Sequence, residues 1–68
     1  MHSVERAVIE GLRVACGRVG SRQVSLLHAA QDRSDYVGVA SHTRRVRAVE
    51  AIVEAIEKVA AELEGGNG

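Results

Sequence analysis

Residues 43–64, TRRVRAVEAIVEAIEKVAAELE, carry the clearest structural signal in this chain. Their apolar side chains recur at spacings of three and four, the repeat that gathers side chains on one side of an α-helix. The members of this stripe are Val46, Val49, Val53, Ile56, Ala60 and Leu63. Ile52 and Val59 widen the stripe beyond a narrow seam. We therefore expect an amphipathic helix over residues 43–64, capped at Ser41 or Thr43, that covers a core or a second helix.

A second, shorter helix is expected near the start of the chain, over residues 3–16. One side of it carries apolar side chains at helical spacing: Val4, Val8, Leu12 and Ala15, with Val19 beyond them. Gly17 and Gly20 follow, and glycine often ends a helix because it adopts the left-handed backbone conformation easily. The first helix is therefore expected to stop near Cys16.

The middle of the chain permits two interpretations. Residues 23–30 and 36–40 flank a polar cluster, residues 31–35 (QDRSD), of the kind that closes a β-hairpin. The alternative makes residues 22–31 helical, because Leu, Ala and Gln favour helix over strand. The favoured fold class is therefore α+β in the order helix, two-stranded β-hairpin, helix (αββα), with an all-α helical hairpin as the alternative.

Gly20, Ser21 and Arg22 stand ahead of Val24, and a helix is expected to begin near Thr43. In these features, in its order of elements and in its size, the chain resembles the gpW-type head-completion proteins of tailed phages. The hairpin loop here lacks the family's basic turn with a glycine, and an acidic, Gly-rich end stands where the family has a basic tail. The resemblance covers architecture alone. By elimination of other classes, we expect an accessory, regulatory or assembly protein of a phage or a bacterium.

A length of 68 residues limits the chain to one domain, expected over residues 1–64 with a flexible Gly-rich tail at 65–68. One tyrosine is the only aromatic residue, and the single Cys16 excludes an internal disulfide. Because so small a core supplies only about 3–5 kcal/mol, we expect a homo-oligomer such as a homodimer. The expected oligomer interface is the stripe of Val46, Val49, Val53, Ile56, Ala60 and Leu63.

A net charge of zero hides an uneven distribution along the chain. Residues 1–48 hold eight arginines and four acidic residues, whereas residues 49–68 hold one lysine and five glutamates. Such asymmetry steers the packing of subunits or marks a basic surface for an anionic partner. No apolar run reaches the roughly 18 residues of a membrane-spanning helix, and the first residues do not resemble a signal peptide. We expect a cytoplasmic protein without a membrane partner.

Arg44, Arg45 and Arg47 stand at the expected start of the second helix, where the helix dipole is already positive. Together with His42 they form a candidate site for a protein partner or an anion. The alternative is a solvated basic turn whose arginines pair with Asp32, Asp35 or the acidic helix of a neighbouring subunit. Nucleic acid is a less favoured partner, because the pI of about 6.8 is well below the range typical of such binders.

No catalytic residue, cofactor or metal ligand is predicted. Cys16 has no visible base or orienting group, so a buried small side chain is the better interpretation. His28 and His42 would meet only if they lay on paired strands, and two histidines make an incomplete metal site. The sequence therefore predicts a small, non-enzymatic protein-interaction module that acts as an oligomer. The alternative is a nucleic-acid-binding regulator that uses Arg44, Arg45 and Arg47.

Overall fold

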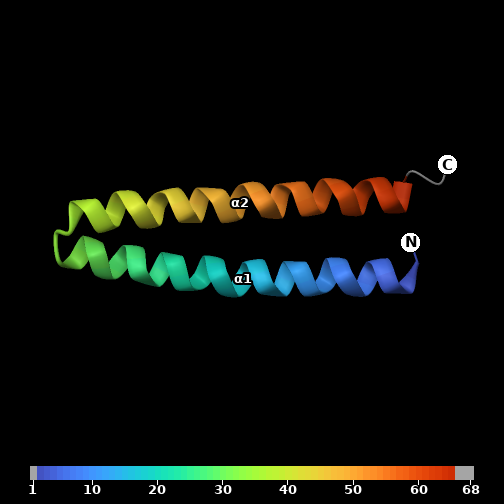
Figure 1. The fold of residues 1–68 in the computed structure, drawn as a ribbon, viewed down its shortest axis with the longest axis horizontal. Coiled ribbons are helices and arrows are strands. Elements are labelled where there is room, and N and C mark those ends of the chain that lie inside the picture. The colour runs from blue at the N-terminus through green and yellow to red at the C-terminus, as the bar shows by residue number, and fades with distance from the viewer. Residues whose placement is uncertain (1, 66–68) are drawn as a thin grey trace.

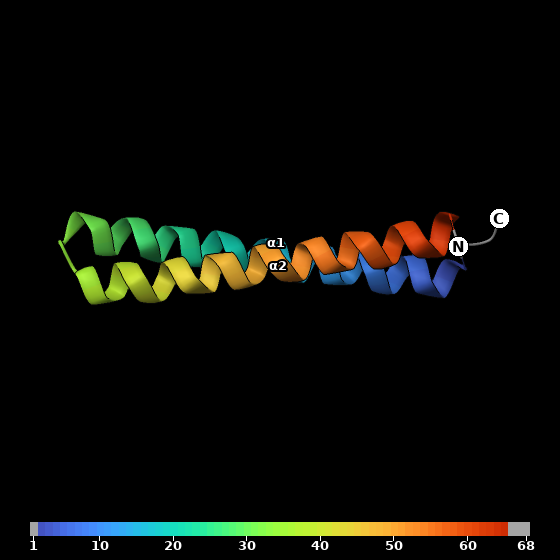
Figure 2. The same cartoon turned by 90° about the horizontal axis from the view of Figure 1, so that it is seen from above.

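Two long antiparallel helices joined by a tight turn make up the computed structural model, which describes residues 2–65 (Figure 1). Helix α1 spans Ser3–Asp32 and helix α2 spans Tyr36–Gly65. The molecule is a thin rod with extents of 52 × 17 × 10 Å, and the helices cross at a shallow angle in the view from above (Figure 2). The expectations for Met1 and for residues 66–68 of the tail lie outside the described residues.

The prediction of a β-hairpin is wrong, and the alternative prediction of an all-α helical hairpin is confirmed. Residues 2–65 contain no strand, and both segments assigned to strands, 23–30 and 36–40, are helical. The buried or half-buried residues here recur at spacings of three and four: Gly20, Gln23, Leu27 and Ala30. This helical repeat extends over the whole of α1, whereas the alternation typical of a strand covers only a few residues. The resemblance to gpW-type proteins depended on the β-hairpin, so it does not hold either.

Both helices are longer than the sequence pattern predicts. Helix α1 does not stop near Cys16 but runs through Gly17 and Gly20, at a cost in helix propensity of about 1 kcal/mol for each glycine relative to alanine. Gly20 faces α2, and a Cβ atom added there would lie 3.4 Å from Cγ1 of Val49. A Cβ atom there would make an ordinary van der Waals contact, so Gly20 lies in the packed seam between the helices but is not required by a clash.

Backbone N–H groups in the turn between the helices donate hydrogen bonds to carbonyls in the last turn of α1. Ser34 adopts a φ of 56°, in the left-handed region. Its N–H donates to the carbonyl of Gln31 over 3.0 Å, and the N–H of Asp35 donates to the carbonyl of Ala30 over 2.8 Å. This is the Schellman pattern that closes many helices. Asp35 then caps α2, because its Oδ1 accepts from the N–H of Gly38 over 3.0 Å. Helix α2 thus begins at Tyr36 rather than at a cap on Ser41 or Thr43.

Replacing Ser34 by glycine is expected to stabilise the hairpin. Glycine adopts a positive φ without the steric cost that a Cβ atom brings, and that cost is about 1 kcal/mol for an ordinary residue. The Ser34→Gly variant should therefore have a melting temperature a few degrees above that of the parent, as measured by circular dichroism. A lower melting temperature would mean that the Ser34 side chain stabilises the turn in a way that the geometry does not show.

The core of the hairpin is thin. Among residues 2–65 only Ile9, Ala30, Ile56 and Ala60 are buried. Cys16 and Leu63 are half-buried and pack against the cluster of Ile9, Ile56 and Ala60 near the ends of the chain. Nearer the turn, the contact between the helices includes a polar pair in which Nδ1 of His42 lies 2.8 Å from Oε1 of Gln23. The monomer therefore has little apolar burial with which to hold its helices together.

Candidate functional site

The residues predicted to form the oligomer interface lie on the side of α2 that faces α1. Ile56 and Ala60 are buried there, and the other four, Val46, Val49, Val53 and Leu63, are half-buried. These six side chains form the seam between the two helices of one chain. They are therefore already covered by α1 and are not exposed to a second copy as an uncovered stripe. Their role in an oligomer is not tested by the monomer and stays a prediction.

A different set of apolar side chains is exposed beside the seam. On α1 it consists of Val8, Leu12, Ala15 and Val19, and on α2 of Ala48, Ile52, Ala55 and Val59. Each set repeats at spacings of three and four, so each forms a column along its helix. Leu12 is 46% exposed and Ile52 is 52% exposed, both high values for large aliphatic side chains. Rotation by 100° per residue places both columns on the same side of the seam, and we call this surface the apolar face.

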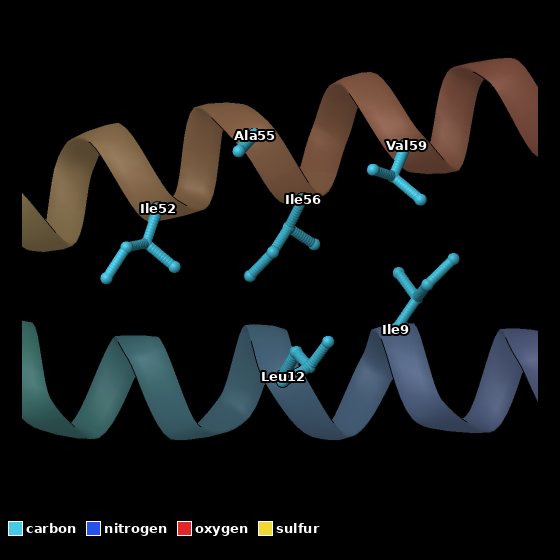
Figure 3. Close-up of a pocket in the computed structure, with 6 residues that line it drawn as sticks. All are labelled: Ile9, Leu12, Ile52, Ala55, Ile56 and Val59. Carbon is cyan, nitrogen blue, oxygen red and sulfur yellow. The ribbon is translucent and has the colours of Figure 1, made fainter.

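A shallow apolar groove joins the two columns (Figure 3). Ile9 and Leu12 line it from α1, and the residues that line it from α2 are Ile52, Ala55, Ile56 and Val59. In the close-up, Ile9 rises from α1 toward α2, and Ile52 and Ile56 descend from α2 toward α1. All six lining residues are apolar, so the apolar face continues across the junction between the helices and reaches the core.

The opposite face carries an ion pair between the helices. Nε of Arg13 lies 2.7 Å from Oε2 of Glu57, its Nη2 lies 2.8 Å from Oε1 of the same carboxylate, and its Nη1 lies 3.2 Å from Oε2 of Glu10. Hydrogen bonding by Arg13 lowers the pKa of Glu57, and hydrogen bonding to Glu57 raises the pKa of Arg13. The rotation per residue places this pair across the seam from Leu12 and Ile52. One face of the hairpin is therefore polar and the other apolar.

The lowered pKa of Glu57 predicts a loss of stability in acid. A carboxylate whose pKa is lower in the folded state stabilises the fold above its unfolded pKa, near 4.5, and this contribution disappears as the pH falls through the folded value. The melting temperature of Glu57→Gln should therefore fall less between pH 5 and pH 2 than that of the parent. Glu50→Gln, which removes an exposed glutamate without an ion pair among residues 2–65, should keep the parent's acid dependence. Equal acid dependence in all three proteins would contradict a stabilising Arg13–Glu57 pair.

The predicted partner or anion site is not assembled as expected. Arg44, Arg45 and Arg47 are exposed but lie in the interior of α2, so the helix N-terminus does not contribute to them. His42 is half-buried, and its Nδ1 contacts Gln23 of α1 in the seam rather than facing solvent with the arginines. None of these three arginines forms an ion pair with Asp32 or Asp35; Arg33 lies 3.8 Å from Asp35 instead. The argument from the helix dipole is therefore wrong for these side chains.

The described residues hold no group of three or more His, Cys, Asp or Glu side chains that could bind a metal ion. Cys16 is a half-buried free thiol against the core, and His28 lies exposed on α1. Neither α1 nor α2 is long and apolar enough to cross a membrane. No family model matches the sequence, and no curated protein or solved structure is significantly similar to it. The function is therefore inferred from the exposed surface of the hairpin.

Proposed function

We propose that this chain is a protein-interaction module that acts as a homodimer, in which the apolar faces of two copies cover each other. The observation that supports this function is the continuous apolar face, formed by both helices and by the groove between them. A helix that packs against one neighbour needs only a narrow seam. A helix in a four-helix bundle carries a seam and one flanking column, which is the pattern of α1 and α2. Two hairpins joined face to face form such a bundle.

The size of the exposed surface supports a partner of this kind. The accessible surface of the chain is 5036 Å², whereas a compact monomer of 7.2 kDa exposes about 4,100 Å². The difference, about 900 Å², is close to the roughly 800 Å² that each partner buries in a standard interface. The radius of gyration is 15.6 Å against about 11 Å for a compact chain of this length. A second copy on the apolar face would remove much of this excess surface.

The turn end of the hairpin favours contact with a further, acidic protein. Three arginines in this half lie outside the apolar face and have no ion pair within the described part of the chain: Arg18, Arg44 and Arg47. Tyr36 and Val37 beside the turn are 80% and 82% exposed. Arginine and tyrosine are enriched in protein interfaces relative to the rest of the surface, and guanidinium groups pair there with carboxylates. The turn end of each hairpin would be the part that meets another protein.

The second candidate function is a nucleic-acid-binding regulator, which the exposed Arg44, Arg45 and Arg47 favour. Arg44 and Arg47 are three residues apart and lie close together on α2, but helix rotation places Arg45 about 100° or more from both, so the three arginines do not form one concentrated basic face. A titration with duplex DNA at increasing salt separates the two functions. Phosphate contacts by these arginines would make binding fall steeply with salt, and the protein-interaction function predicts no measurable binding at physiological salt.

The concentration dependence of unfolding tests the homodimer. Because only the folded dimer would bury the apolar face, its melting temperature should rise by several degrees as the chain concentration increases from about 1 to 100 µM. Circular dichroism at 222 nm follows the transition over this range. A melting temperature that does not change with concentration would contradict the proposed function.

A further inference from the structure

The columns of the apolar face end in opposite charges. Along α1, the residues at spacings of three and four are Glu5, Val8, Leu12, Ala15, Val19 and Arg22. Along α2, the corresponding residues are Arg45, Ala48, Ile52, Ala55, Val59 and Glu62. Each column thus consists of four apolar side chains between one glutamate and one arginine. Because the helices are antiparallel, both glutamates lie toward the chain ends and both arginines toward the turn (Figure 1).

None of the four charged residues that end the columns has an ion-pair partner among residues 2–65. All four are exposed, and the ion pairs of the hairpin involve other side chains: Arg13 with Glu10 and Glu57, Arg33 with Asp35, and Lys58 with Glu54. Each column therefore carries a negative and a positive end, about 25 Å apart over 17 residues of helix, without an internal counterion.

We infer that the second copy lies antiparallel on the apolar face, with its turn pointing away from the turn of the first. This inference rests on the proposed homodimer and specifies its geometry. In an antiparallel pair, Glu5 and Glu62 of each copy lie near Arg22 and Arg45 of the other, whichever helix covers which. In a parallel pair, four glutamates meet at one end and four arginines at the other. Like charges at an interface weaken the wrong arrangement, and opposite charges select the right one.

A distance between the two turn ends tests the orientation. Tyr36 is exposed next to the turn, so a spin label on Tyr36→Cys, in a Cys16→Ala background, reports its position. The middle of the α2 column lies between residues 53 and 54, about 26 Å along the helix from Tyr36. The antiparallel dimer therefore predicts a label–label distance of about 50 Å by double electron–electron resonance, whereas a parallel dimer predicts about 20 Å or less.

The pairing of the charged column ends is tested by neutralising the glutamates at these ends. Glu5→Gln combined with Glu62→Gln should raise the dissociation constant about tenfold, because four opposite-charge contacts are lost in each antiparallel dimer. The matched control is Glu50→Gln with Glu64→Gln, which removes the same charge outside the columns and should leave the constant within about twofold.

The outcomes separate this inference from the homodimer itself. A dimer with a short label distance, or one that the Glu5 and Glu62 changes tighten, would overturn the antiparallel arrangement and leave the homodimer in place. A chain that is monomeric at every concentration would overturn both.

Discussion

Ile56→Ala is expected to unfold the hairpin or to leave it only marginally folded at 25 °C. Ile56 is 8% exposed and belongs to the small buried cluster with Ile9 and Ala60. Truncating a buried isoleucine to alanine costs about 2–5 kcal/mol, which is comparable to the whole stability of a domain of this size. The variant's helical signal at 222 nm should fall sharply, and its melting temperature should drop by more than ten degrees.

Lys58→Ala is the matched control on the same helix. The Lys58 side chain is 76% exposed, and its ammonium lies 3.9 Å from Glu54, which is 73% exposed. An exposed pair of this kind contributes little, so the variant should melt within a few degrees of the parent. Equal shifts for Ile56→Ala and Lys58→Ala would contradict the phase of α2 in the hairpin.

Ile52→Gln is expected to dissociate the homodimer while leaving the hairpin helical. Ile52 is 52% exposed in the monomer, so a glutamine side chain at this position should change the stability of the monomer little. In the dimer the change occurs twice in an apolar interface, and losing about 1.5 kcal/mol of burial in each copy raises the dissociation constant roughly 100-fold. Analytical ultracentrifugation should show the shift in mass at a concentration where the parent is dimeric.

Val14→Gln is the control for exposure alone. Val14 is 48% exposed, close to the value for Ile52, but it lies outside both columns of the apolar face. It should therefore leave the dissociation constant nearly unchanged. If the two variants dissociate the protein equally, or if neither does, the apolar face is not the dimer interface.

The pattern of residues 43–64 was sufficient to predict a helix and its buried side. Ile56 and Ala60 are buried and the other four residues of the stripe are half-buried, as the helical repeat requires. The start of the helix was not predictable in this way, because it depends on the capping hydrogen bond from Gly38 to Asp35 in the turn. The predicted start of the helix was therefore seven residues too late. For this reason the prediction placed Arg44, Arg45 and Arg47 at a helix end, whereas they lie in the interior of α2.

The packed side of α1 was the harder problem. Val4, Val8, Leu12 and Ala15 form its most apolar side, but the hairpin contact uses Ile9, Cys16, Gly20 and Gln23 instead. Polar and small residues lie there with specific partners: Gln23 contacts His42, and Gly20 lies beside Val49. A count of apolar residues cannot find such a seam. It finds the side of α1 that the hairpin leaves uncovered.

The same difficulty explains the incorrect β-hairpin. Val24 and Leu26 alternate with polar residues over a span too short to distinguish a strand from a helix. The polar cluster at residues 31–35 did mark the turn correctly, since the chain reverses at Arg33, Ser34 and Asp35. The helix propensity of Leu, Ala and Gln in residues 22–31 favoured the correct alternative, whereas the alternation of Val24 and Leu26 favoured the wrong one.

The mass of the protein in solution is the most direct test of the homodimer. Sedimentation equilibrium of the full chain at about 50 µM and physiological salt should give twice the chain mass of 7.2 kDa, with a monomer fraction that grows on dilution. The measurement requires neither a label nor a variant. A single species of 7.2 kDa that remains helical at this concentration would show that the apolar face stays uncovered and would contradict the homodimer.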